Sequence, residues 1–295
     1  MPWLINAAQL EKFCKSQKNV IVLDASWHLP MENRDANKEF QERRIVGARF
    51  LDLEAFHDVD SSIPNMLTRD EQRIRELVGS LGITDDHKII FYDHSRLHTS
   101  CRALWMFKVF GHNPNLLYVL DGGYDAWEKY GGKFESGDVR AVTPKSYTLR
   151  YEAHYVRTLV QLKSNLHHPM EQVVDMRHPV RYAGGAEHRP GLRSGHIPGS
   201  FSFPYSTMFS PEGYWKPLDR IRKQLTGIGV SLSHPIVTTC GSGMTAPILD
   251  FVLDLMEQDL QHAVYDGSWS EWGADKLYPG EESLAERPVA TCLEK

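Results

Sequence analysis

The stretch PIVTTCGSGMTAPILDFV (235–252) decides the fold, because its hydrophobic pattern changes at a single turn. Residues 235–239 are a short, mostly apolar run, as in a strand buried within a parallel sheet. Gly241 and Gly243 then allow a tight turn, since glycine tolerates backbone conformations that other residues avoid. After the turn, apolar residues recur at helical spacing, which predicts a helix over 245–257. A strand, a tight turn and a helix together are the repeating unit of a parallel α/β sheet.

The chain contains this pattern twice. Four segments recur in the same order: 19–26 with 171–177, 43–53 with 194–204, 88–93 with 235–240, and 117–127 with 262–272. The length of 295 residues also suits two domains of roughly 150 residues each. We therefore predict an α/β fold with two tandem domains, each a parallel sheet flanked by helices. Their expected bounds are 1–138 for the first domain, 139–153 for a linker and 154–295 for the second domain.

Two more helices are expected in the first half of the chain. Residues 68–81 place apolar side chains on one helical face, at Ile74, Leu77, Val78 and Leu81. Thr68 and Glu71 have the spacing of a capping box at the start of this helix, and Gly82 is placed to end it. Residues 99–110 show the same periodicity, which makes Cys101 an expected core residue.

Composition excludes several classes of partner. The net charge of −5 provides no general attraction to nucleic acid or to anionic membranes. No run of about 20 apolar residues exists to cross a bilayer, and the first residues do not resemble a signal peptide. Four cysteines without C-x-x-C or zinc-finger spacing fit a reducing compartment. We expect a cytoplasmic monomer with no cofactor and no metal, the pair His167 and His168 lacking further ligands at useful spacing.

Cys240 is the predicted nucleophile. Ligands of parallel α/β sheets bind beyond the carboxyl ends of the strands, which is where Cys240 stands. The glycine-rich turn exposes backbone N–H groups, and the helix start adds partial positive charge, so this loop favours an anion and the thiolate form of a cysteine. An inert buried cysteine is the alternative, but such a position does not require flanking glycines. In the first half, Asp93 occupies the corresponding position.

The loop CGSGMTA (240–246) resembles the active-site loop of the mercaptopyruvate sulfurtransferases, a family with two rhodanese domains in tandem. VLDASWHLP (22–30) and RDANKEF (34–40) resemble the start of that family's first domain. SGHIPGS (194–200) and YDGSWSEW (265–272) resemble signatures of its second domain. The resemblance implies that only the second domain is catalytic, and that Cys240 carries sulfur from 3-mercaptopyruvate as a persulfide. A thiol acceptor such as thioredoxin or a small thiol would then remove the sulfur, or cyanide would do so.

The same resemblance implies the residues that hold the substrate. Arg181 and Arg189 match two arginines that bind the substrate carboxylate in this family, the match of Arg189 requiring a one-residue gap. Arginine suits this task because its planar guanidinium group binds a carboxylate through two hydrogen bonds. The loop residues Gly241, Gly243, Met244 and Thr245 are expected to complete the binding site.

Ser242 is expected to take part in catalysis by donating to the substrate carbonyl or to the leaving enolate. Related enzymes are argued to use this serine with an acid and a histidine of the first domain. Here the acid position is Glu54, and Asn65 stands where histidine is expected, so the chain departs from the complete serine–histidine–acid relay. The hydroxyl of Thr245 is expected to cap the following helix.

Three motif residues outside this loop have structural interpretations. His196 in the GHIPG motif is interpreted as a structural histidine. Trp269 and Trp272 are expected to pack in the core.

Three alternatives stay open. A thiosulfate sulfurtransferase would usually have basic residues directly after the cysteine, where this chain has Gly241, Ser242 and Gly243. A cysteine phosphatase requires an arginine six residues after the cysteine, and Ala246 holds that position. A non-catalytic rhodanese-like scaffold would usually lack the cysteine or the glycines. Cys292, near the end of the chain, is interpreted as an exposed bystander rather than a resolving thiol.

Overall fold

The structure is a computed structural model, and it describes residues 3–16, 19–256 and 260–292. The chain forms two compact units. The first unit comprises Met1–Val59, Leu67–Glu152 and Ser210–Trp215. The second comprises Asp60–Met66, Ala153–Phe209 and Lys216–Lys295. Each unit thus includes a short segment from the other half of the sequence.

The first unit is built on a five-stranded parallel sheet in the order β1-β6-β5-β2-β4. Its strands are β1 (Leu4–Ile5), β2 (Val20–Asp24), β4 (Arg49–Phe50), β5 (Lys88–Tyr92) and β6 (Leu117–Leu120), and β3 (Arg44–Ile45) pairs antiparallel with β7 (Phe134–Glu135). Its helices are α1 (Ala7–Ser16), α2 (Ala36–Glu42), α3 (Glu71–Ser80), α4 (Ser100–Val109) and α5 (Gly123–Tyr130), with short 3-10 turns η1 (Pro30–Glu32), η2 (Glu54–Phe56) and η3 (Pro114–Leu116).

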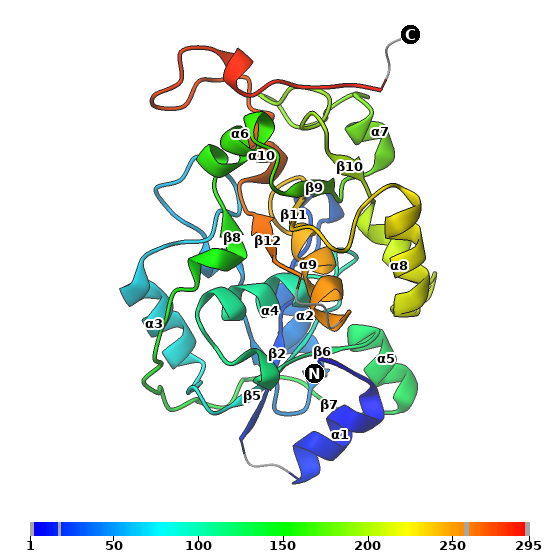
Figure 1. Ribbon diagram of the computed structural model, residues 1–295. Helices are drawn as coiled ribbons and strands as arrows, with labels where there is room; N and C mark the ends of the chain where they lie inside the picture. Colours follow the sequence, from blue (N-terminus) through cyan, green and yellow to red (C-terminus); the bar gives the residue numbers. More distant parts are fainter. Residues whose placement is uncertain (1–2, 17–18, 257–259, 293–295) are drawn as a thin grey trace. The chain divides into compact units, whose positions relative to one another are not determined.

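The second unit repeats the arrangement, with a parallel sheet in the order β8-β12-β11-β9-β10 (Figure 1). Its strands are β8 (Val156–Arg157), β9 (Gln172–Asp175), β10 (Phe201–Ser202), β11 (Ile236–Thr239) and β12 (His262–Tyr265). Its helices are α6 (Leu159–His167), α7 (Pro179–Tyr182), α8 (Leu218–Gly227), α9 (Ala246–Leu255) and α10 (Ser268–Trp272), with 3-10 turns η4 (Ala153–Tyr155), η5 (Tyr205–Met208) and η6 (Leu284–Glu286). Because each strand has its counterpart in the first sheet, the predicted internal repeat and α/β class are confirmed.

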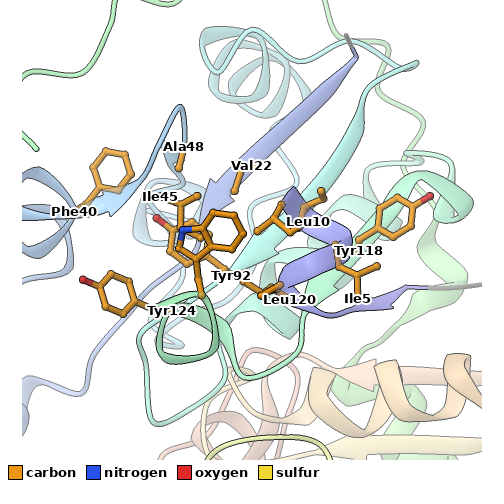
Figure 2. Packing of buried hydrophobic residues seen from close by; sticks show 13 residues of the cluster. Ile5, Leu10, Val22, Phe40, Ile45, Ala48, Tyr92, Tyr118, Leu120 and Tyr124 are labelled. Carbon is orange, nitrogen blue, oxygen red and sulfur yellow. The ribbon is translucent and has the colours of Figure 1, made fainter. Parts of the chain in front are cut away.

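Both faces of the first sheet are covered, as the continuous apolar strands require. On one face, alternate strand residues such as Val22 and Tyr92 pack with Leu10 of α1 and Phe40 of α2 (Figure 2). On the other face, the ring of Phe91 lies 5.3 Å from the ring of Phe107 in α4. The strands alternate their side chains between these two helical layers.

The second sheet is covered in the same way. Val173 and Val237 pack with Leu162 of α6 and with the indole rings of Trp269 and Trp272 in α10. The predicted core positions of the two tryptophans are confirmed, since both are buried. Helix α9 lies against β11 and β12 on the opposite face (Figure 1). Within the residues that the structure describes, none of the helices combines the length and the apolar character that crossing a membrane would require.

The helix predicted over 68–81 exists, but its expected capping box is wrong. Helix α3 begins only at Glu71, and its N-cap is Asp70, whose carboxylate accepts the N–H of Arg73. The Thr68 hydroxyl instead accepts the N–H of Asp70. Aspartate is at least as good an N-cap as threonine, and its charge also suits the helix N-terminus, so it sets the boundary. Gly82 ends the helix with a left-handed backbone, as predicted.

The predicted helices at 99–110 and 245–257 correspond to α4 and α9, although residue 257 lies outside the described part of the chain. The expected hydroxyl cap of Thr245 is wrong, because its side chain makes no capping hydrogen bond. Thr245 has a helical backbone (φ −106°, ψ −13°) rather than the extended one of a capping residue, and Pro247 has no N–H to offer it. Cys101 is fully buried in α4, as expected of a core residue.

Candidate active site

Cys240 lies at the carboxyl end of β11, a central strand between β9 and β12. All four residues of β11 are buried, and the chain then turns through residues 241–245 into α9. Cys240 itself is only 2% exposed. Gly243 has φ +78°, a conformation that favours glycine, so the loop takes this course at little backbone cost. The predicted strand, turn and helix are therefore confirmed around Cys240.

Two groups direct hydrogen toward the Cys240 sulfur. The N–H of Thr245 lies 3.4 Å from Sγ. The hydroxyl of Ser268 lies 3.9 Å from Sγ and 2.8 Å from the Tyr265 carbonyl, so its one proton is shared between these two acceptors. Ser268 also accepts the N–H of Cys240 at 3.1 Å. Donors of this kind stabilise a thiolate or a persulfide anion more than a neutral thiol.

Sequence reasoning missed Ser268, although it lies in a segment that recurs in both halves. It has φ +49°, which is unusual for serine and places its hydroxyl beneath the cysteine. Its counterpart Gly123 has a similar φ of +52° and lies so close to the Asp93 carbonyl that a Cβ there would be 2.4 Å from the oxygen. The signal that could have found Ser268 is the replacement of this glycine in the second copy of the repeat.

Arg181 and Arg189 both lie beside the cysteine loop. A Cβ on Gly241 would be 3.5 Å from Nη1 of Arg181 and 3.6 Å from Nη2 of Arg189. Arg189 is held by Nη1, which donates to the Gly241 carbonyl and to the Ser270 hydroxyl. Its Nη2 is buried and has no hydrogen-bond partner among the described residues. A buried N–H of a charged group is costly to leave unpaired, so this atom marks a place for an anion.

Glu187, a further residue that sequence reasoning missed, positions these arginines. Its carboxylate, almost fully buried, accepts from Nη2 of Arg181 at 2.7 Å and from Nε of Arg189 at 3.3 Å. Burial raises the pKa of Glu187, but the hydrogen bond from Arg181 and the charges of both arginines outweigh it and leave the pKa below its usual value. The signal in the sequence was a lone acid within an arginine-rich loop.

The charge balance of this cluster is positive. Burial and the charge of Arg181 lower the pKa of Arg189, while Glu187 and Cys240 act in the opposite direction. Glu187 compensates one of the two guanidinium charges. Arg177, an earlier arginine of the same loop, pairs with Asp175 at 2.7 Å, and its Nη1 also lies 4.0 Å from the Glu187 carboxylate. The charges of Arg177 and Asp175 cancel each other. The cluster of Arg181, Glu187 and Arg189 therefore has one positive charge left for a ligand.

Ser242 is half-buried, and its hydroxyl oxygen accepts a hydrogen bond from Nδ2 of Asn65 at 2.8 Å. Asn65 belongs to the segment Asp60–Met66 of the second unit. Glu54, the expected acid, lies in the first unit, where its carboxylate accepts from the indole N–H of Trp27 at 2.9 Å. Asn65 thus meets the serine where the family pattern places histidine, and Glu54 is engaged elsewhere.

His196 has structural contacts. It is buried, its Nδ1 lies 2.7 Å from the Tyr182 carbonyl, and its ring stacks on the ring of Tyr182 with centroids 3.8 Å apart. Burial lowers the pKa of His196, which favours the neutral ring. These contacts support the interpretation of His196 as a structural residue that anchors the end of α7, next to Arg181. Met244 is buried in the loop. Cys292 is exposed, as expected.

The counterpart of this loop in the first unit is filled by its own side chain. The carboxylate of Asp93 accepts the N–H groups of Ser95 at 3.0 Å and Ser100 at 2.9 Å. The N–H groups of Ser95 and Ser100 are thus occupied by a side chain of the loop itself. The first unit has no nucleophile at this position.

A cavity of about 190 Å³ lies close to the Asp93 loop. It is lined by charged residues that pair with one another, Arg34 donating twice to Glu39 at 2.7 Å. His94, also in its wall, stacks on Tyr124. None of its lining residues is a cysteine. The chemistry of the chain is therefore expected at Cys240 and not in this cavity.

Comparison with known proteins agrees with this geometry. The rhodanese-like domain family matches residues 6–130 and 158–275. The chain is 35% identical to the 3-mercaptopyruvate sulfurtransferase of Mus musculus over 268 residues, covering 90% of this chain and 89% of that one. It is 38% identical to the thiosulfate sulfurtransferase of Cricetulus griseus over 256 residues, covering 85% and 84%.

A solved structure extends the similarity to three dimensions. The crystal structure of SseA from Escherichia coli, a 3-mercaptopyruvate sulfotransferase, matches with a TM-score of 0.81 and 30% identity. The match covers 92% of this chain and all of that one. Two domains match the family, a cysteine follows the carboxyl end of a central strand, and the relatives are similar over most of their length. The chain therefore belongs to the rhodanese-like domain family and is a sulfurtransferase with two such domains.

Proposed function

We propose that this sulfurtransferase takes sulfur from 3-mercaptopyruvate onto Cys240 and passes it to a thiol. The observation that carries the proposal is the pair of guanidinium groups of Arg181 and Arg189, which flank Gly241, the residue next to the nucleophile. A carboxylate held there would place the rest of a small substrate over the cysteine loop. Bidentate binding by arginine would also fix its orientation.

Charge favours this donor over thiosulfate. The cluster of Arg181, Glu187 and Arg189 has one uncompensated positive charge, which suits a donor with one carboxylate. Thiosulfate has two negative charges and would leave one of them unmatched in a half-buried site. Weaker use of thiosulfate is still expected, because the loop N–H groups can donate hydrogen bonds to any anion.

The sulfur transfer follows from the groups around Cys240. The Cys240 thiolate attacks the substrate sulfur, a new S–S bond forms, and the C–S bond breaks with its electron pair moving into the enolate of pyruvate. The proton of the substrate thiol is delivered to the enolate carbon, so pyruvate leaves and a persulfide anion stays on Cys240. The N–H of Thr245 and the hydroxyl of Ser268 are placed to stabilise that anion.

In the second half of the cycle an acceptor thiolate attacks the outer sulfur. Its bond to Cys240 breaks, the Cys240 thiolate is restored, and the acceptor leaves as a persulfide. Thioredoxin or a small thiol would serve as acceptor. The two half-reactions form a double displacement, for which ping-pong kinetics are the signature.

The test is kcat/KM for 3-mercaptopyruvate and for thiosulfate in the wild type, in Cys240→Ser and in Glu187→Gln. We expect a preference for 3-mercaptopyruvate and no activity in Cys240→Ser. Glu187→Gln removes one negative charge beside the arginines and is expected to shift the ratio toward thiosulfate by about 10-fold. If the wild type prefers thiosulfate, the chain would instead be assigned as a thiosulfate sulfurtransferase, the activity for which several similar proteins are named.

A further inference from the structure

In the hydrogen bond between Asn65 and Ser242, asparagine is the donor and serine is the acceptor. Nδ2 of Asn65 lies 2.8 Å from the serine Oγ. A serine hydroxyl has one proton to donate. Since its oxygen already receives the amide proton, the hydroxyl proton of Ser242 is free to point at another acceptor. Ser242 lies two residues after Cys240, in the same loop.

The backbone of Asn65 is arranged for this contact. Asn65 has φ +64°, in the left-handed region that asparagine tolerates better than most residues. The segment around it is anchored by Ile63, which is buried and whose carbonyl accepts the N–H of Met66. A left-handed backbone held in this way fixes the direction of the short amide side chain.

We propose that Asn65 is a positioning residue that keeps Ser242 as a permanent hydrogen-bond donor toward the ketone oxygen of the sulfur donor. The inference rests on the proposed use of 3-mercaptopyruvate. As the C–S bond breaks, negative charge moves onto that oxygen, and a donor already aimed at it stabilises the enolate. No proton is transferred through Ser242, because the proton that completes pyruvate comes from the substrate thiol.

The hydrogen bond from the Asn65 amide to Ser242 does not depend on pH, whereas one from a histidine would. An amide does not gain or lose a proton between pH 5 and 9, whereas histidine titrates at about 6.5. Ser242 is therefore held as a donor at every pH in that range. Thiosulfate has no ketone and leaves as sulfite, so its reaction does not use this donor.

The experiment measures the rate of persulfide formation on Cys240 in a single turnover, with saturating 3-mercaptopyruvate and separately with thiosulfate. Asn65→Gly removes the amide but keeps the left-handed backbone without strain. We expect the rate with 3-mercaptopyruvate to fall about 10-fold and the rate with thiosulfate to stay within about 2-fold. Asn33→Gly is the matched control, since Asn33 also has a left-handed backbone (φ +49°) but ends the 3-10 turn η1 in the first unit.

The pH dependence provides a second readout that a merely structural role would not change. In the wild type the ratio of the two rates is expected to be constant within about 2-fold from pH 5.5 to 7.5, a range below the ordinary titration of a substrate thiol at about 8.5. Asn65→His should make that ratio change around the titration of the new imidazole. Equal losses with both donors in Asn65→Gly, or a wild-type ratio that already titrates, would overturn the inference. A wild type inactive with 3-mercaptopyruvate would overturn the proposed function instead and remove the basis for the inference.

Discussion

Ser268 is a single residue that distinguishes the copy of the repeat that contains Cys240 from the other copy. In the second unit its hydroxyl lies between the Tyr265 carbonyl and the Cys240 sulfur, at 2.8 Å and 3.9 Å. In the first unit the same position is Gly123, and the residue above it is Asp93 instead of cysteine. One copy has cysteine with serine, and the other has aspartate with glycine. This difference indicates that the Ser268 hydroxyl is a hydrogen-bond donor to the Cys240 sulfur.

We expect Ser268→Ala to slow persulfide formation on Cys240 by about 10-fold with either sulfur donor, because the anion loses one donor and the Cys240 N–H loses its acceptor. Stopped-flow single-turnover kinetics would measure this rate. Ser200→Ala is the control, since that hydroxyl also donates to a nearby carbonyl, of Ile197 at 2.7 Å. An unchanged rate of persulfide formation in Ser268→Ala would show that the side chain of Ser268 contributes only to packing.

At the scale of elements, the site is a turn between β11 and α9 that holds its shape through Gly243. The φ of +78° costs an L-residue about 1–2 kcal/mol, and any relaxation would move the loop away from Sγ. Thr245, two residues later, must present its N–H to the sulfur from the start of the helix.

Gly243→Ala is therefore expected to lower kcat/KM by about 100-fold and stability by about 1 kcal/mol. Gly199→Ala separates these two effects, because Gly199 has a similar φ of +76° with no atom within 4 Å of its added Cβ. That variant should lose a similar amount of stability, measured by urea denaturation, and keep its activity. Equal activity in both variants would contradict the importance of the loop geometry.

Much of this architecture could be predicted from the sequence, and the exceptions have physical causes. The short apolar strands, such as β5 and β11, were predictable because burial on both faces demands apolar residues throughout. The start of α3 was not, because Asp70 competes with Thr68 for the same capping role. The role of Glu187 was missed because an acid among arginines in a loop gives no periodic signal, and its function depends on how the loop folds back on itself.

At the scale of the whole molecule, the two sheets use equivalent aspartates differently. Asp175, at the end of β9, pairs with Arg177 at 2.7 Å. Asp24, at the end of β2, has Ser26 in place of that arginine and accepts the N–H of Ser26 at 2.9 Å, with further hydrogen bonds from the side chains of Ser26 and Tyr92. Burial, with the charge of Asp93 as a smaller contribution, raises the pKa of Asp24 to about 6 against hydrogen bonds that lower it.

The sign of the resulting pH dependence follows from this shift. The folded protein binds a proton at Asp24 between pH 4 and about 6, where the unfolded chain has released it, so stability falls as pH rises through that window. Asp24→Asn is expected to gain about 3 kcal/mol at pH 7 and little at pH 4. Asp175→Asn should lose stability at pH 7, because it leaves Arg177 buried without its partner. Urea denaturation at the two pH values would measure both, and a gain for Asp24→Asn that does not depend on pH would contradict the assignment.

The proposed reaction requires that Cys240 take up one sulfur atom from 3-mercaptopyruvate. The most direct measurement mixes the protein with this donor in the absence of an acceptor thiol, then compares the pyruvate released with the mass of the peptide that contains Cys240. We predict one equivalent of pyruvate, a mass gain of one sulfur atom on that peptide alone, and loss of both in Cys240→Ser. Pyruvate release without added sulfur on Cys240, or sulfur found instead on Cys292, would rule out Cys240 as the sulfur carrier.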